Sequence, residues 1–363
     1  MKIAIFIHQI GGTGGGQRVI SELANYLQSK GHEVEFFTPF YNQENVYEEF
    51  KKIKVNILKP SIKFLSPFVF LFKKIKGFDV YLFDDFPAYF ASRRNKPNIM
   101  FCYTPKRDFY DLREFNYKNA SFKGKIKLFL KELLFKQLDF SAVQNVDTII
   151  TLSEHVQKRI ERYYKRFDSK VIRWGMDVDK FKFKKYGDYF FAVSRLEKAK
   201  RIDVIIKAMG FVKNKDIKLY VAGRGPDEKN IRELAKKYQN VKFIGEVDDK
   251  QLVDLYANSY GVVYIPVAED DQGLVNLEAW ASEKVPITVN EGGTPEAITD
   301  GKNGFLIDDV TPEKIAEKMD YLWENKNIAI KMGKDGRKQV GKWDWKNVFP
   351  RFEKAIAEAA KKG

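Results

Sequence analysis

The sequence has little of what stabilises small secreted domains or builds metal centres. It contains one cysteine, Cys102, and three histidines among 363 residues. A single cysteine excludes an intramolecular disulfide framework and a cysteine-rich metal module, and it fits a reducing compartment. The longest apolar stretch, residues 64–72, is interrupted by Ser66 and Pro67, whereas a membrane-spanning helix needs roughly 20 residues. The first residues show no signal-peptide pattern, so we predict a cytoplasmic protein.

Charge is distributed unevenly along the chain. The formal net charge is +15. Residues 51–173 contain 27 basic and 12 acidic residues and carry the whole excess, whereas residues 251–300 contain one lysine and nine acidic residues. An even, solvated surface would not separate charge in this way. We therefore expect an anionic partner for the first half and an acidic site in the second half.

Length and hydrophobic patterning predict two domains. A chain of this length exceeds the roughly 250–300 residues at which one hydrophobic core stops growing. Short apolar runs alternate with helical patterns throughout, which predicts two doubly wound α/β domains, each with a parallel sheet covered by helices. The predicted parts are a first domain over 1–173, a linker over 174–187 and a second domain over 188–345. A last helix, over 346–363, is a candidate to pack back on the first domain.

A glycine-rich loop, residues 11–16, follows the first predicted strand and precedes a helix. Backbone amides in such a loop can approach an anion at the start of the next helix. A dinucleotide site would also need an acidic residue near the end of the second strand, but that strand ends in Thr38-Pro39. The loop alone therefore fits both a nucleotide site and a tight strand–helix turn.

Two cations follow the first strand of the second domain. Arg195 and Lys200 lie five residues apart on a loop between a strand and a helix, where they can hold a diphosphate from two sides. Because 64 of the 363 residues are basic, ordinary surface cations remain an alternative.

An acidic segment opens a later helix of this domain. Glu269, Asp270 and Asp271 follow a strand, at the edge where parallel α/β sheets bind ligands. The amides of Gly273, Leu274 and Val275 would face a phosphate there. Glu278, one turn further, lies on an apolar helix and needs polar partners if it is buried. Sugar hydroxyls would serve, and a structural carboxylate bonded to neighbouring backbone is the alternative.

Taken in order, these motifs resemble the retaining glycosyltransferases of family 4, which have the GT-B fold of two Rossmann-like domains with a cleft between them and a C-terminal crossover helix. Bacterial and archaeal mannosyltransferases are the most similar in appearance, because they carry a Cys-His-Thr-Pro-x-Arg segment similar to residues 102–107. The resemblance covers nearly the whole chain. It is carried by Gly14-Gly15-Gly16-Gln17-Arg18, Arg195-x4-Lys200, Gly223-Arg224-Gly225-Pro226, Asp270-x7-Glu278, Gly292-Gly293-Thr294-Pro295-Glu296 and Gly301-Lys302-Asn303-Gly304-Phe305-Leu306.

The resemblance implies a role for each matching position. Arg195 and Lys200 would neutralise the donor's diphosphate, Glu278 would hold its ribose, and Asp270 would contact the transferred sugar. The donor would be a GDP-, UDP- or ADP-sugar, with no further cofactor and no metal. Backbone contacts to the donor would come from Gly14, Gly15, Gly16, Gly223, Gly245, Gly273, Leu274 and Val275.

The sequence departs from the family pattern at two of these positions. The family usually has glutamate where Asp270 stands and histidine where Tyr103 stands, and tyrosine cannot act as an imidazole. The predicted lining of the sugar and acceptor cleft is Tyr103, Arg107, Asp84, Asp85 and Asp271. Asp84-Asp85 also resembles the metal-binding pair of the other glycosyltransferase fold, but at a first-domain strand end it is interpreted as cleft lining or as structural.

The resulting prediction is transfer of a hexose, with retention, from a nucleotide sugar to a glycan or lipid-linked glycan. One alternative is a nucleotide-sugar 2-epimerase on the same architecture. The other is a basic nucleic-acid-binding protein, but the basic half has no recognisable nucleic-acid motif, so we expect no nucleic-acid partner.

Two basic, apolar stretches of the first domain predict docking on the inner face of an anionic membrane. Residues 64–76 and a helix over 121–140 both combine apolar residues with flanking lysines, among them Lys125, Lys127 and Lys131. An apolar face with flanking lysines is typical of an interfacial helix. A helix packed on its own sheet with a solvated lysine edge is the alternative.

Overall fold

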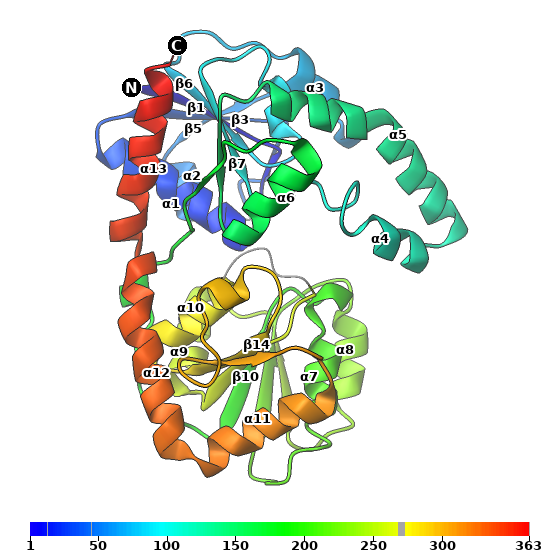
Figure 1. Cartoon of the computed structure of the whole chain (residues 1–363), viewed down its shortest axis with the longest axis vertical. Helices are drawn as coiled ribbons and strands as arrows, with labels where there is room; N and C mark the ends of the chain where they lie inside the picture. Colours follow the sequence, from blue (N-terminus) through cyan, green and yellow to red (C-terminus); the bar gives the residue numbers. More distant parts are fainter. Residues whose placement is uncertain (13, 45, 268–272, 363) are drawn as a thin grey trace. The chain divides into compact units, whose positions relative to one another are not determined.

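The computed structural model describes residues 1–12, 14–44, 46–267 and 273–362, which form two compact units. The first unit contains residues 1–174 and 348–363, and the second contains residues 175–347. Each unit has a parallel sheet with helices packed on it (Figure 1). The predicted fold class of two Rossmann-like α/β domains is confirmed.

The main sheet of the first unit has seven parallel strands. The chain builds one half of the sheet outward from β1 and then the other half outward from β6, so β1 and β6 are neighbours where the strand order reverses. At such a point the loops leave adjacent strands in opposite directions, and a crevice opens at their carboxyl ends. In sheet order the strands are β5 (Lys54–Ile57), β3 (Glu33–Thr38), β1 (Lys2–Ile7), β6 (Val80–Asp84), β7 (Asn98–Cys102), β8 (Thr148–Thr151) and β9 (Lys170–Val171), and a separate short pair is β2 (Gln9–Ile10) and β4 (Phe40–Tyr41).

The first helix follows the predicted burial pattern. It buries Val19, Ile20, Leu23 and Leu27, whose helical spacing predicts one apolar face, and Gly31 follows its end with a φ of 83°. The helices that pack in or on this unit, including 3-10 segments marked η, are α1 (Gly15–Ser29), α2 (Glu48–Lys51), η1 (Lys63–Leu65), α3 (Ser66–Phe72), η2 (Ala88–Ala91), α4 (Arg113–Asn119), α5 (Phe122–Gln144), α6 (Glu154–Tyr164) and α13 (Trp345–Ala360).

The last helix, α13, returns to the first unit as a C-terminal crossover helix. Its buried face carries Phe349 and Phe352, two of the residues whose spacing predicts that face. The Phe352 ring stacks on Trp174 with centroids 4.6 Å apart. The Glu353 carboxylate accepts a 2.8 Å hydrogen bond from the Tyr26 hydroxyl on α1. Aromatic packing and a charge-assisted hydrogen bond therefore both attach the end of the chain to this unit.

The second unit repeats the arrangement with six parallel strands, and β10 and β13 are the neighbours at its reversal point. In sheet order its strands are β12 (Val241–Gly245), β11 (Lys218–Ala222), β10 (Tyr189–Val193), β13 (Gly261–Tyr264), β14 (Val285–Val289) and β15 (Phe305–Ile307). Its helices are η3 (Val178–Lys180), η4 (Lys198–Lys200), α7 (Ile202–Ala208), α8 (Glu228–Ala235), α9 (Asp249–Asn258), α10 (Leu274–Ala281), η5 (Thr294–Glu296), α11 (Pro312–Glu324), α12 (Lys326–Val340) and η6 (Gly341–Trp343). None of the described helices is both long enough and apolar enough to cross a membrane.

The segment predicted as a linker, residues 174–187, is largely packed into the two units. Trp174 is buried in the first unit, where it stacks on α13. Met176, Val178 and Phe181 are buried in the apolar core of the second unit. These apolar residues pack the first part of the segment into the two units, whereas residues 182–185 are exposed.

Candidate functional site

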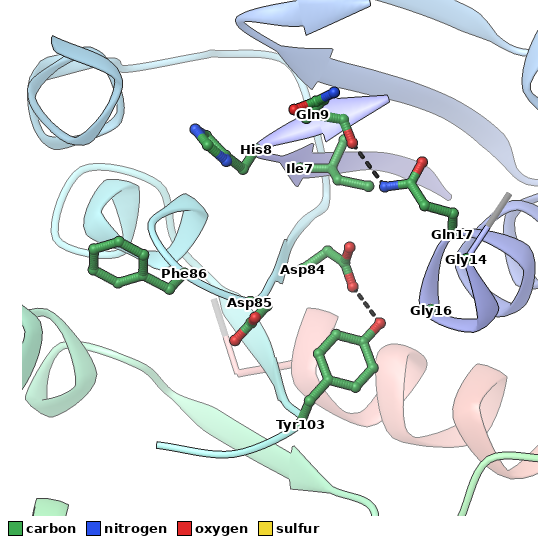
Figure 2. Close-up of a pocket in the computed structure, with 10 residues that line it drawn as sticks. All are labelled: Ile7, His8, Gln9, Gly14, Gly16, Gln17, Asp84, Asp85, Phe86 and Tyr103. Atoms are coloured by element: carbon green, nitrogen blue, oxygen red, sulfur yellow. Dashed lines mark hydrogen bonds between the residues drawn. The ribbon is translucent and has the colours of Figure 1, made fainter. Parts of the chain in front are cut away.

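The first unit has a pocket of about 490 Å³ at the reversal point of its sheet (Figure 2). Its walls come from the carboxyl ends of β1, β6 and β7 and from the start of α1. The structure thus brings together several of the residues predicted from the sequence. The lining residues are Ile7, His8, Gln9, Gly14, Gly16, Gln17, Asp84, Asp85, Phe86 and Tyr103.

A hydrogen bond joins Asp84 to Tyr103 inside the pocket. The Tyr103 hydroxyl donates to Asp84 Oδ1 at 2.5 Å (Figure 2), and the Tyr103 ring stacks on Trp174 with centroids 5.8 Å apart. Burial raises the pKa of the Asp84 carboxyl to about 7; the Tyr103 hydrogen bond opposes this shift, and the charge of Asp85 adds to it. The carboxyl can therefore gain or lose a proton near neutral pH, as ionisable groups at functional sites often do.

Three polar lining residues, His8, Gln9 and Gln17, were not identified as site residues from the sequence. Gln17 Nε2 donates to the Gln9 carbonyl oxygen at 2.7 Å, which ties the first turn of α1 to the segment after β1. Burial, aided by the charges of two lysines, lowers the pKa of His8 to about 4, so its ring is neutral at neutral pH. The sequence did contain a signal for His8. It directly follows β1, at the edge where parallel sheets bind ligands.

Two residues predicted for this site do not line the pocket. Gly15 is the first residue of α1, between the lining glycines Gly14 and Gly16. Arg107 was predicted to line the sugar and acceptor cleft, but its Nη2 donates to Asp111 Oδ2 at 2.9 Å, and it is not among the lining residues. The carboxylate four residues away provides the charge-assisted hydrogen bonds that the guanidinium needs.

The second unit places its two predicted cations at the carboxyl edge of β10. The Arg195 side chain is 69% exposed, and its nearest described carboxylate, Glu197, is 3.7 Å away. Lys200 Nζ donates to the Tyr264 hydroxyl at 2.8 Å. Because Tyr264 ends β13, this bond holds Lys200 at the reversal point of the second sheet. One cation is thus free to extend toward a ligand, and the other is positioned by the sheet.

Gly223 and Gly245 allow the loops around these cations to approach closely. Gly223 has a φ of 136°, and a Cβ there would lie 1.9 Å from the Ser194 carbonyl oxygen. Its amide donates to the Gly245 carbonyl oxygen at 2.8 Å, and Gly245 itself has a φ of 88°. Both positions require glycine for conformational reasons, which accounts for them independently of any contact to a donor.

Helix α10 begins beside the residue that positions Lys200. Gly273, its N-cap, has a φ of 74°, and a Cβ there would lie 3.2 Å from the Tyr264 ring. Leu274 and Val275 form the first turn of the helix and are half-buried. The start of α10 and the Lys200 ammonium therefore both lie close to Tyr264. Asp270 and Asp271, both predicted site residues, lie outside the described residues.

Glu278 lies one turn into α10 and is half-buried. Its Oε2 accepts a 2.7 Å hydrogen bond from the Tyr256 hydroxyl of α9. Tyr256 is fully buried, and burial together with the Glu278 charge raises its pKa well above the usual value. The hydroxyl therefore stays protonated and holds the carboxylate in place. Partial exposure leaves that carboxylate able to accept further hydrogen bonds.

Comparisons with known proteins match both units. The family model described as Glycosyltransferase Family 4 covers residues 13–180, and the one described as Glycosyl transferases group 1 covers residues 177–339. The chain belongs to this glycosyltransferase family. The human α-1,3/1,6-mannosyltransferase ALG2 is 25% identical to this glycosyltransferase, with 93% of this chain and 91% of ALG2 covered. An uncharacterized glycosyltransferase of Methanocaldococcus jannaschii is 28% identical, with 65% of this chain and 63% of the relative covered.

Solved structures establish the GT-B fold of this glycosyltransferase. Sucrose-phosphate synthase from Thermosynechococcus elongatus superposes with a TM-score of 0.80 at 16% identity, over the whole of both chains. Anabaena HepE in complex with UDP-glucose superposes with a TM-score of 0.75 at 16% identity, over 99% of this chain and all of HepE. These superpositions confirm the GT-B architecture that the motifs predicted.

Proposed function

We propose that this glycosyltransferase moves a hexose from a nucleoside-diphosphate sugar to a hydroxyl of a glycan or lipid-linked glycan, with retention at the anomeric carbon. The observation that carries the proposal is the placement of Arg195 and Lys200 at the reversal point of the second sheet, beside the start of α10. Two cations and a helix start can neutralise a diphosphate, and Glu278 on the same helix can accept the hydroxyls of a ribose. The name of ALG2 favours mannose and the HepE complex favours glucose.

For the chemical step we propose front-face displacement without a metal. The bond between the anomeric carbon and the diphosphate oxygen breaks while the acceptor oxygen attacks on the same face, and the leaving diphosphate takes the acceptor's proton. Arg195 and Lys200 stabilise the charge that grows on the diphosphate. Among the described residues no group of three or more His, Cys, Asp or Glu side chains is placed to hold a metal ion.

We propose that the pocket of the first unit binds the acceptor. Asp84 and Asp85 offer carboxylate oxygens to acceptor hydroxyls, and the Gln9 and Gln17 side chains add amide groups beside them. Tyr103 stands where family relatives carry histidine, and its hydroxyl is already bound to Asp84. In this proposal Tyr103 acts as a positioning residue for that carboxylate.

A panel of GDP-, UDP- and ADP-sugars in thermal denaturation tests the proposal. A ligand that binds only the folded chain stabilises it by about 2.7 kcal/mol at 100 times its Kd, so we expect one class of nucleotide sugar to raise the Tm clearly. Incubation of that sugar with candidate acceptors should then yield a glycoside of unchanged anomeric configuration. Conversion of the donor's own sugar without an acceptor would indicate the epimerase, and no binding by any member of the panel would contradict the proposal.

We expect Glu278→Gln to weaken donor binding at least about tenfold while lowering stability little, because hydrogen bonds from ribose hydroxyls to a charged acceptor contribute about 1.5–3 kcal/mol. Titration calorimetry with the nucleoside diphosphate measures the change in affinity. Tyr256→Phe is the matched control, since it removes the 2.7 Å hydrogen bond but keeps the carboxylate. If both variants lose stability and neither loses affinity, Glu278 has only a structural role.

A further inference from the structure

The helices α4 and α5 form an arm on the first unit. The buried residues of α5 all lie in its C-terminal part, from Phe135 to Val143, which packs against the core of the unit. The N-terminal part extends beyond the sheet with α4 beside it (Figure 1). Arg113 of α4 donates to Glu132 of α5 at 2.8 Å, which holds the two helices together. The arm is therefore an ordered projection of this unit.

The outer part of the arm exposes large apolar side chains. Phe122 is 79% exposed and Leu133 is 66% exposed, and three of the apolar residues between them are about half exposed. Their spacing of three, four and seven residues places the central positions on one face of the helix. Soluble proteins seldom leave so large an apolar face to water. The exposed positions on α5 are Phe122, Ile126, Phe129, Leu130, Leu133 and Leu134.

Lysines surround this face. Lys123, Lys125 and Lys127 are exposed, and none of them forms a salt bridge with any residue that the structure describes. Lys131 follows them on the same helix, but its Nζ donates to Asp108 Oδ2 at 2.6 Å. From residue 113 to 136 the chain carries seven basic and two acidic residues. The apolar face is thus enclosed by uncompensated positive charge.

The second stretch predicted to dock, residues 64–76, is mostly part of the core. Phe70 is buried, and its neighbours Phe68 and Val69 pack against the buried cluster of the first unit. Only its ends, including Phe64 at 63% exposure, remain on the surface, and the Phe64 ring lies 6.4 Å from that of Phe135 on α5. The middle of this stretch is therefore not free to dock, whereas Phe64 and Phe72 remain exposed, and Phe64 extends the apolar surface of the arm.

We propose that the exposed face of α5 lies in the headgroup region of an anionic lipid bilayer. Apolar burial and lysine attraction act together there, as in interfacial helices. A second copy of this chain is the less suitable occupant, because two such faces would bring their lysines together without compensating acidic residues. Docking would keep a lipid-linked acceptor within reach; that consequence rests on the proposed function, whereas the membrane contact does not.

Co-sedimentation of the full chain with vesicles tests the contact. We expect binding to phosphatidylcholine vesicles that contain phosphatidylglycerol, little binding to phosphatidylcholine alone, and release at high salt because the attraction is screened. Each lysine near an anionic surface changes partitioning about fivefold, so the triple variant Lys123→Glu, Lys125→Glu, Lys127→Glu should lose at least about 100-fold. Phe129→Ser with Leu133→Ser should also abolish binding. The control is a variant with the same three lysine-to-glutamate changes on α12, at the exposed Lys331, Lys334 and Lys338. It should bind anionic vesicles as strongly as the unchanged chain does.

Equal recovery from neutral and anionic vesicles, or loss of binding in the α12 control as well, would overturn the proposal. So would a concentration-dependent dimer in sedimentation velocity that Leu133→Ser dissociates, because a second copy would then cover the face. Donor-dependent transfer to a water-soluble acceptor is measured on the same variants. If the unchanged chain binds vesicles but transfers no sugar, the proposed function fails and the membrane contact stands. If the unchanged chain transfers sugar but binds no vesicles, the membrane contact fails and the proposed function stands.

Discussion

Arg195→Ala and Lys200→Ala should each lower the rate of sugar transfer about 100- to 1000-fold while the Tm changes little. The expected loss equals that of removing one preorganised group that stabilises transition-state charge. Arg195 is 69% exposed and contributes little to packing. Lys200 donates a hydrogen bond to the Tyr264 hydroxyl, and loss of such a bond should cost about 1 kcal/mol of stability. Initial rates with saturating acceptor, together with thermal denaturation, measure both effects.

Lys198→Ala is the matched control for these two variants. Lys198 lies between them on η4 and is exposed, so its loss removes one positive charge from the same loop without removing either proposed contact. It should keep activity within about twofold, because distant or exposed charges are largely screened by salt. If Lys198→Ala lost as much activity as the other two variants, transfer would depend only on the total positive charge of the loop and not on the contacts of Arg195 and Lys200. Near-normal rates in Arg195→Ala and Lys200→Ala would contradict the assignment of the diphosphate site.

The central strands and the motif-bearing helices were predictable from sequence, and the edges of the sheets were not. Strands such as β6 and β7 are buried at every position, so they appear in the sequence as continuous apolar runs. Edge strands such as β5 and β9 carry lysines and are only partly buried. Their short mixed sequences resemble loops, because pairing with a neighbour, which no local pattern records, is what makes them strands.

For the candidate site, the sequence predicted residue types at strand ends but not their partners. Asp84 and Tyr103 were both predicted to line the cleft, yet the hydrogen bond between them depends on β6 and β7 being adjacent. Tyr256, which holds Glu278, lies on a different helix and carries no local signal. Arg107 bonds to Asp111 four residues away and does not line the pocket, a local pairing that was not considered. Hydrogen bonds between side chains on different helices and strands depend on how those elements pack. No local pattern in a single sequence predicts them.

The variant Asp84→Asn should raise the stability of the chain at about pH 8 and lower its transfer activity. Burial raises the pKa of Asp84 from 3.8 to about 7, so between these pH values the folded chain binds a proton that the unfolded chain has lost. The stability of the unchanged protein therefore falls as pH rises through this window. Asparagine stays neutral and can still accept the Tyr103 hydroxyl, so the variant lacks this dependence. Since one pKa unit corresponds to about 1.4 kcal/mol, the gain should be ~1–4 kcal/mol.

Urea denaturation of both proteins at about pH 4, 6 and 8 measures the difference, which should be near zero at the lowest pH and largest at the highest. Asp139, whose burial raises its pKa to about 6, titrates in both proteins, so its contribution cancels when their stabilities are compared.

Tyr103→Phe provides a test of opposite sign. It removes the hydrogen bond that favours the charged Asp84 carboxylate, so it should destabilise the chain most at about pH 8. Equal destabilisation by Asp84→Asn at every pH would show that the carboxylate is a structural group. Gain of stability with loss of transfer would show that the chain retains an unfavourable charge because acceptor binding uses it.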